Sequence, residues 1–132
     1  MSKFLLAVGA IPLLLYLSIL ALMYFFQERL IFLPSRLAKS FEFSFKLPFR
    51  EHYLPVGDAV LHGLVFEKPN AIGTIVYFHG NAGALNSWGD VSYDFERFPY
   101  HFVIFDYRGY GKSSGIITSE KVLQHDAEAI HR

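Results

Sequence analysis

The sequence predicts a mixed α/β fold that follows one long apolar helix. Three patterns carry this prediction: an uncharged run from Phe4 to Phe26, two strand-like segments on either side of a turn at 55–58, and a strand–helix–strand pattern between residues 73 and 105. The expected division of the 132 residues is an anchor at 1–27, a juxtamembrane linker at 28–50 and a partial α/β domain at 51–132.

The first run is long enough to cross a lipid bilayer. Its 23 residues hold no charge, and as a helix they would span roughly 34 Å, against about 30 Å for a hydrocarbon core. A cleaved signal peptide is the alternative, but signal cores usually hold only about 7–15 apolar residues, and no A-x-A-like site follows Phe26. We therefore expect a single-pass membrane anchor that contacts lipid through residues 4–26.

Basic residues beside the anchor favour one orientation. Lys3 and the terminal amine flank one end, whereas Arg29, Arg36 and Lys39 flank the other. The positive-inside rule then favours a cytoplasmic C-terminal part, by a margin of about one charge.

Composition excludes several classes of function. The chain has 12 basic and 12 acidic residues, which leaves no electrostatic footprint for nucleic acid. It has no cysteine, so disulfides, thiolate nucleophiles and Cys-zinc sites are excluded. The six histidines show no H-E-x-x-H or other metal-ligand spacing, and a P-loop would need glycine where Asp106 stands. No metal and no cofactor are expected.

The segment after the anchor has an alternating aromatic pattern. Phe41, Phe43 and Phe45 lie on one side of an extended chain. Such a pattern predicts either a short strand or a set of rings that lies on the membrane surface.

The remaining elements follow in order along the chain. Residues 51–54 and 60–66 read as an antiparallel pair around the turn at 55–58. Residues 73–78 and 101–105 are short apolar runs, typical of parallel strands that are covered on both faces. Between them, one helix is predicted by the spacing of Leu85, Trp88, Val91, Phe95 and Phe98.

A last helix is predicted near the C-terminal end of the sequence. Thr118 or Ser119 can cap it, and Glu120 is favourably placed in its first turn. The apolar face of this helix would be formed by Leu123, Ala127 and Ile130.

The turn H-G-N-A-G at 79–83 is the candidate functional site of this sequence. It links an apolar strand directly to a helical pattern. Gly80 and Gly83 permit close approach of the backbone to a ligand, and a following helix adds a positive end. Backbone N–H groups fixed in this way can stabilise an oxygen that becomes negatively charged.

Together with D-Y-R-G-Y-G-K-S at 106–113, this turn resembles the α/β-hydrolase superfamily, and most closely its single-pass, membrane-anchored serine hydrolases. The resemblance implies the N-terminal half of an α/β-hydrolase sheet, with antiparallel first strands and then a parallel strand–helix–strand unit. It also implies that the backbone N–H of Asn81 is one oxyanion donor, supported by His79, Gly80, Ala82 and Gly83. The second donor would follow a nucleophile in a G-x-S-x-G elbow.

Other polar residues near these motifs are interpreted as structural. His79 has no nucleophile placed beside it, so we expect it to hold the turn by hydrogen bonds rather than act as a base. Asp106 and Arg108 are expected to order the second loop, since a guanidinium can donate several hydrogen bonds to carbonyls or to a carboxylate.

Ser113 lies in a literal G-x-S-x-G match at 111–115. The elbow requires serine on a sharp turn directly between a strand and a helix. Here the strand is expected to end near Asp106 and the next helix to begin near Thr118, so Ser113 is not expected to be a nucleophile. Asp126 and His131 lie five residues apart on one predicted helix and would point to different faces.

The function predicted from these residues is that of an N-terminal part of a membrane-anchored serine hydrolase. It would act on esters, thioesters or amides, with a small acyl substrate in the full-length parent, and would be inactive alone because it lacks a nucleophile and a catalytic triad. The alternative is a non-catalytic, membrane-bound interaction fragment. In either case a bare strand edge beside residues 73–78 would favour self-association.

Overall fold

The computed structural model describes residues 2–132, with side chains from residue 10 onward. Contacts divide the chain into two compact units, Met1–Phe32 and Leu33–Arg132. The boundary between these units lies after Phe32, and residues 33–50 are grouped with the second unit.

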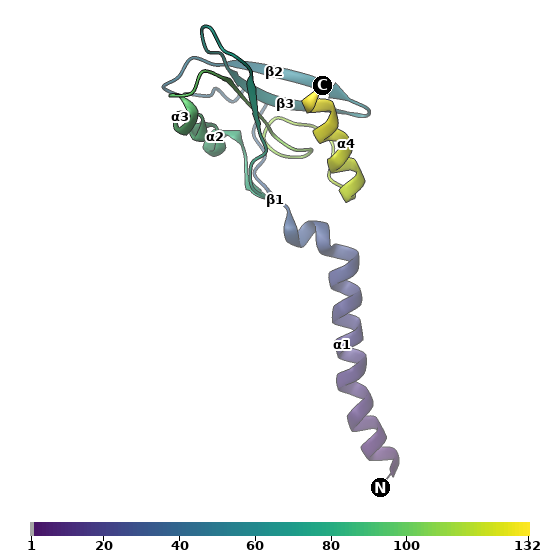
Figure 1. The fold of residues 1–132 in the computed structure, drawn as a ribbon. Helices are drawn as coiled ribbons and strands as arrows, with labels where there is room; N and C mark the ends of the chain where they lie inside the picture. Colours follow the sequence, from purple (N-terminus) through teal and green to yellow (C-terminus); the bar gives the residue numbers. More distant parts are fainter. Residues whose placement is uncertain (1) are drawn as a thin grey trace. The chain divides into compact units, whose positions relative to one another are not determined.

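The first unit is the helix α1, Ser2–Ile31, coloured purple to blue in Figure 1. The segment Ala10–Ile31 is long and apolar enough to cross a membrane, with a mean hydropathy of 1.9 and none of its most apolar window buried. Pro12 lies within the helix. The same criteria of length and composition are also met by signal sequences and by core helices of soluble proteins.

The second unit contains a four-stranded mixed sheet. Its strands are β2 (Arg50–Val56), β3 (Ala59–Phe66), β4 (Thr74–Tyr77) and β6 (His101–Phe105), in the spatial order β2-β3-β6-β4. β2 and β3 are antiparallel, and β4 and β6 are parallel, as the sequence patterns predicted. The order leaves β4 at one edge of the sheet.

The β2–β3 hairpin turns at Gly57, whose φ of +58° is one that glycine adopts without strain. Val56 pairs with Ala59 across the turn, and the register continues to Arg50 opposite Val65. Seven of the eight residues of β3 are buried, so this strand forms the centre of the core.

The connection from β4 to β6 differs from the single helix that was predicted. It consists of α2 (Leu85–Trp88), the 3-10 helix η1 (Gly89–Val91) and α3 (Ser92–Phe95). Four residues of the predicted apolar stripe pack on the core: Leu85, Trp88, Val91 and Phe95. The fifth, Phe98, lies beyond the end of α3 and is 37% exposed. The helix tightens at Gly89, which has low helix propensity and lies so close to the Phe45 ring that a Cβ would be 2.3 Å from it.

Neither alternative for the aromatic segment 41–45 describes the structure. These residues form no strand, and Phe43 and Phe45 pack against the core of the second unit, together with Leu47 and Phe49. The Phe43 and Phe45 rings stack on each other, and Phe45 meets the core residue Phe66 edge to face. Burial of large aromatic surface stabilises an irregular segment that lacks ladder hydrogen bonds. The core cluster beneath them consists of Leu64, Phe66, Leu85, Phe102 and Ile104.

The last helix, α4 (Glu120–His131, yellow in Figure 1), begins where the sequence predicted. Ser119 is its N-cap and accepts a hydrogen bond from the Val122 N–H. Its residues Ala129 and Ile130 pack against Val56, Leu61 and Phe105, a second small core.

Two short strands lie outside the main sheet. β1 (Leu33–Pro34) pairs in parallel with β5 (Ala82–Gly83). No sequence pattern predicts this pair, because two-residue strands have no detectable period.

Candidate functional site

The turn 79–83 and the loop 106–113 lie at one edge of the sheet. Because β4 and β6 are parallel, the turn 79–83 and the loop 106–113 leave the sheet at the same, carboxyl end of the pair. In open α/β sheets this edge is where ligands bind. The structure therefore brings together the two motifs that the sequence singled out.

Side chains from around the turn hold several of its carbonyl groups. The hydroxyl of Tyr107 donates to the carbonyl of His79 at 2.6 Å, and that of Tyr110 donates to the carbonyl of Asn81 at 2.6 Å. The indole N–H of Trp88 donates to the Ala82 carbonyl at 2.7 Å. Burial raises the pKa of Tyr107 to about 12, so its hydroxyl stays protonated and remains a donor.

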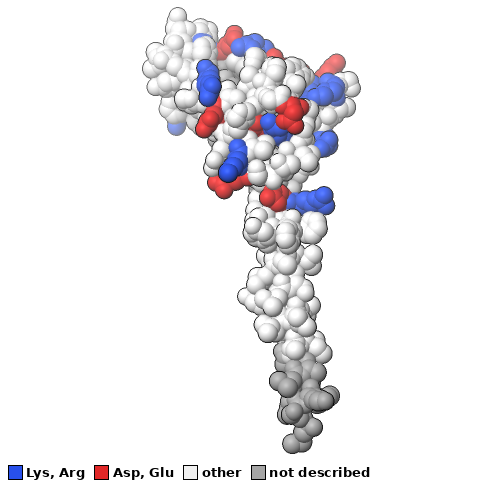
Figure 2. All heavy atoms as spheres, turned by 90° about the vertical axis from the view of Figure 1, so that its right-hand side faces the viewer, with Lys and Arg blue, Asp and Glu red and all other residues white. Residues whose placement is uncertain are grey.

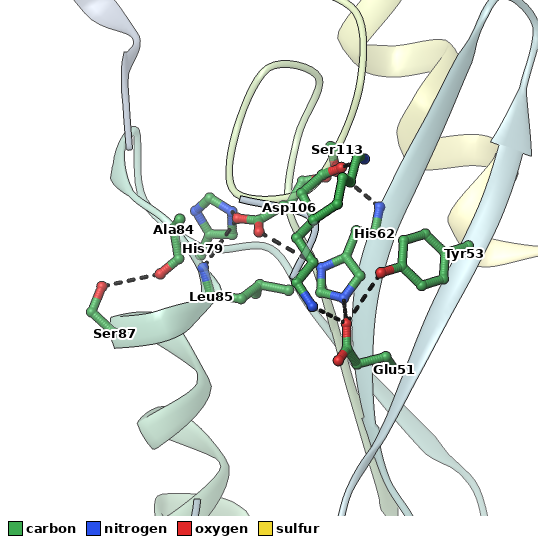
Figure 3. Close-up of polar contacts among 11 residues, drawn as sticks. Glu51, Tyr53, His62, His79, Ala84, Leu85, Ser87, Asp106 and Ser113 are labelled. Carbon is green, nitrogen blue, oxygen red and sulfur yellow. Dashed lines mark hydrogen bonds and ion pairs between the residues drawn. The ribbon is translucent and has the colours of Figure 1, made fainter. Parts of the chain in front are cut away.

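His79 is buried and bonds to its own turn. Its Nδ1 lies 2.7 Å from the carbonyl oxygen of Gly80. Since a carbonyl only accepts, Nδ1 must carry the hydrogen. Its Nε2 lies 3.5 Å from Oδ1 of Asp106 (Figure 3).

The two glycines of the turn have local structural reasons. A Cβ on Gly80 would lie 2.9 Å from the Trp88 ring, and Gly83 has a φ of +88°. Packing against Trp88 at Gly80 and the positive φ at Gly83 are reasons for glycine in addition to the expected approach of a ligand.

Asp106 is fully buried at the end of β6. Its Oδ1 accepts the Leu85 N–H at 3.1 Å, which ties the second loop to the first helix after the turn. Its Oδ2 lies 4.0 Å from Nδ1 of His62. A Cβ on Gly111 would lie 1.8 Å from Oδ2, so this carboxylate fills the space that only glycine leaves.

A second polar cluster, which the sequence analysis missed, extends from His62. The Glu51 carboxylate oxygen Oε2 accepts from His62 Nε2 at 2.7 Å (Figure 3). The same oxygen accepts from the Lys112 ammonium at 2.7 Å. The side chain of Lys112 is only 3% exposed. Burial would raise the pKa of Glu51, but the hydrogen bonds from Lys112 and His62 outweigh it and lower the pKa below 4.5. The available signal was His62 itself, the only polar residue in the apolar run 59–66.

Ser113 is buried and its hydroxyl is engaged on both sides. It accepts the backbone N–H of His62 at 2.8 Å and donates to the carbonyl of Asp106 at 2.8 Å. This hydroxyl joins β3 to the end of β6, an arrangement that leaves its proton bonded to a backbone carbonyl.

Arg108 connects three elements. Its Nε and Nη2 donate to the two carboxylate oxygens of Asp126 on α4, at 2.7 and 2.9 Å. Nη1 donates to Asp58 in the hairpin turn, and Nη2 also donates to the carbonyl of Val56. The hydrogen bonds to Asp126 raise the pKa of the guanidinium, and the hydrogen bond from Arg108 lowers the pKa of Asp58.

Across residues 2–132, no group of three or more metal-ligating side chains is placed to hold an ion. Figure 2 shows acidic and basic side chains interspersed over the visible face of the second unit, without a large patch of one sign.

Several curated proteins match part of the chain. Proteins named YfhR, described as uncharacterized, are 40% identical over 76 residues in Salmonella typhimurium and 43% identical over 63 residues in Escherichia coli K12. These matches cover 53% and 47% of this chain, and 26% and 22% of the relatives. An uncharacterized protein of Acanthamoeba polyphaga mimivirus is 33% identical over 84 residues, which are 59% of this chain and 27% of that protein. The matched region thus spans about a quarter of these relatives.

No family model matches the chain. Among solved structures, the esterase Pf2001 of Pyrococcus furiosus aligns with a TM-score of 0.50 and 18% identity, over 75% of this chain and 40% of that one. At this identity the likeness concerns the fold. Across 75% of its length, the chain has a mixed α/β fold similar to that of part of this esterase.

Proposed function

We propose that this chain is the N-terminal part of a membrane-anchored serine hydrolase and that it supplies the first element of an oxyanion hole. The proposed donor is the backbone N–H of Asn81, in a turn formed by His79, Gly80, Asn81, Ala82 and Gly83. The reaction would be hydrolysis of an ester, thioester or amide with a small acyl group. The observation that carries the proposal is the direction in which the carbonyl groups of this turn are held.

The directions of these carbonyl groups determine the directions of the N–H groups in the same peptides. In a trans peptide, the C=O of one residue and the N–H of the next point in opposite directions, and the described residues contain no cis bond. The Gly80 carbonyl is directed at the His79 ring, so the Asn81 N–H of the same peptide points away from that ring. Likewise, the Asn81 carbonyl accepts from Tyr110, so the Ala82 N–H points the other way.

The surroundings of the turn fit the same role. Asn81 and Ala82 are exposed at the carboxyl edge of the parallel pair, where a substrate can reach them. Donors whose positions are fixed in advance stabilise a developing oxyanion without reorganisation at the moment of reaction. In this proposal, His79, Asp106 and Arg108 hold the two loops and do not transfer protons.

The polypeptide 1–132 is proposed to be inactive by itself. One oxyanion donor contributes about a hundred- to a thousandfold to turnover, whereas loss of a serine nucleophile or its histidine costs roughly a millionfold. The serine of the G-x-S-x-G match is buried, and its hydroxyl is bonded to the backbone. The oxyanion turn therefore cannot offset the missing nucleophile.

Membrane attachment is proposed from the surface of α1. All described side chains from Ala10 to Ile31 are exposed except Glu28, which is partly buried, and a water-soluble protein rarely leaves so large an apolar surface uncovered. A cytoplasmic location of the second unit rests only on the small excess of basic residues after the helix.

The downstream coding sequence is the first test. A strand that ends in G-x-S-x-G soon after codon 132, followed by Asp and His, is the expected result. An immediate stop codon would contradict the hydrolase proposal and favour the non-catalytic interaction fragment. The observation in favour of that second function is the edge strand β4, which pairs only with β6 within the described sheet.

A fluorophosphonate probe, which labels activated serines, is the second test. Polypeptide 1–132 in detergent is expected to show no labelling above that of Ser113→Ala. In a longer protein that includes the elbow, Asn81→Pro should lower turnover about a hundredfold or more, because it removes the N–H. Asn81→Ala keeps the N–H and is the matched control. Labelling of Ser113 in the short polypeptide would overturn the assignment.

A further inference from the structure

Residues 33–37, which we call the strap, lie between the oxyanion turn and the loop 106–113. On one side, the N–H groups of Leu33 and Ser35 donate to the carbonyls of Asn81 and Gly83, at 2.8 and 2.9 Å. On the other side, the strap exchanges hydrogen bonds with Gly111 through the Ser35 carbonyl and the Leu37 N–H, at 2.8 and 2.9 Å. Within this arrangement, β1 at the start of the strap and β5 at the end of the turn form a two-stranded sheet that is separate from the main sheet.

The strap completes the set of contacts on the carbonyl side of the turn. The carbonyls of His79, Gly80 and Ala82 are held by the side chains of Tyr107, His79 and Trp88. The Gly83 carbonyl is held by the strap, and that of Asn81 by the strap and Tyr110. Backbone donors on a paired strand are fixed in direction, whereas a hydroxyl rotates about its bond. The strap therefore supplies two contacts whose direction is set by the backbone.

We propose that the strap is a positioning segment for the oxyanion turn: it fixes the peptides at Asn81 and Gly83, so that the N–H groups of the turn keep the direction needed to bind negative charge. This inference rests on the proposed function. The strap begins two residues after Ile31, the last residue of α1. The stretch of chain that leaves the membrane helix is thus also the one that shapes the site.

The side chains of the strap allow a clean test. Ser35 and Leu33 are exposed, so Ser35→Ala and Leu33→Ala change little besides the surface. Ser35→Pro and Leu33→Pro each remove one N–H that bonds to the turn. Residues before proline favour extended backbone, which suits Pro34 in β1, the residue before Ser35→Pro. Two independent proline–alanine pairs guard against a single variant that fails to fold.

The first measurement is amide hydrogen exchange in the whole chain in detergent. The peptide covering residues 78–85 is expected to exchange about five- to tenfold faster in each proline variant than in its alanine control. The reason is that loss of one hydrogen bond to the turn raises the population of its open states by about this factor. The amides of β3 and β6 are expected to exchange at unchanged rates. Equal exchange in the proline and alanine variants would overturn the proposal, as would the same acceleration in β3 and β6.

The second measurement separates the strap from the function of the turn. In a longer protein with hydrolase activity, the proline variants should lower kcat about tenfold and leave KM unchanged, because a loosened donor acts on the transition state. A turn that exchanges faster while kcat stays constant would support the strap and contradict the oxyanion role. A loss of kcat without faster exchange would overturn the positioning role.

Discussion

Arg108 and Asp126 form a buried ion pair with two parallel hydrogen bonds. Their side chains are 7% and 3% exposed, so removal of one partner leaves the other charge in a poorly solvated site. Through this pair, the loop after β6 is tied to α4, and through Asp58 it is tied to the β2–β3 turn.

We expect Arg108→Ala to lower the free energy of unfolding by about 3–5 kcal/mol, because Asp126 loses its main partner. Arg50→Ala is the control: it removes an ion pair with Glu67 whose side chains are 54% and 62% exposed, and should cost less than about 1 kcal/mol. Urea titration of the two variants provides the comparison. Equal destabilisation would show that the buried pair has no special role.

The carboxylate of Glu51 predicts a pH dependence of stability. Its pKa is lowered from 4.5 in the folded chain, and such a group adds stability above its unfolded pKa and loses it as the pH falls through the folded pKa. The difference in unfolding free energy between the native chain and Glu51→Gln should therefore be largest near pH 7 and shrink below about pH 4.5. A difference that stays constant from pH 7 to pH 3 would contradict the role of Glu51.

At the scale of elements, β4 is one of the two edge strands of the described sheet, and β2 is the other. β4 pairs with β6 on one side only, and the open side presents unpaired backbone groups that can join another strand. Its connection to β6 is broken into three short helical pieces, which place the apolar stripe on the core without a straight axis. We therefore propose that a second copy of this polypeptide can pair with the open edge of β4.

Val76→Lys should reduce concentration-dependent association of the chain, because a lysine on an edge strand opposes pairing with a second strand. Ile72→Lys is the control, since Ile72 is 72% exposed and lies before the strand. Sedimentation velocity at several protein concentrations measures both variants in the same detergent. Equal effects of the two lysines would assign the association to general charge or to the anchor.

At the scale of the whole molecule, the two compact units should unfold independently. Trp88, the single tryptophan, packs against the core of the second unit, whereas α1 is a separate unit. In detergent, urea should complete the change in Trp88 fluorescence while much of the helical circular dichroism remains, because apolar helices keep their hydrogen bonds in an apolar medium. Coincident transitions of the two signals would instead indicate one cooperative unit.

Periodicity and turn residues were sufficient to predict much of the fold. The hairpin at Gly57, the parallel pair of β4 and β6, and the cap of α4 at Ser119 all depend on local patterns that the sequence displays. The prediction for the aromatic segment 41–45 was wrong. Alternation of Phe and polar residues also occurs where the rings pack into a core without forming a strand. The prediction of a single helix after the turn was also wrong. The helix tightens at Gly89, where the backbone packs against Phe45, and a contact between residues so far apart in the chain leaves no local pattern.

By itself, the sequence determined the apolar helix, the order of the strands along the chain and the two motifs that flank the proposed site. Only the tertiary structure decided what surrounds those motifs. The contacts of Lys112 with Glu51, of Arg108 with Asp126, and of the strap with the oxyanion turn all join residues distant in sequence. Such contacts depend on which backbone groups and buried charges meet after the sheet has formed, and no local pattern encodes that meeting.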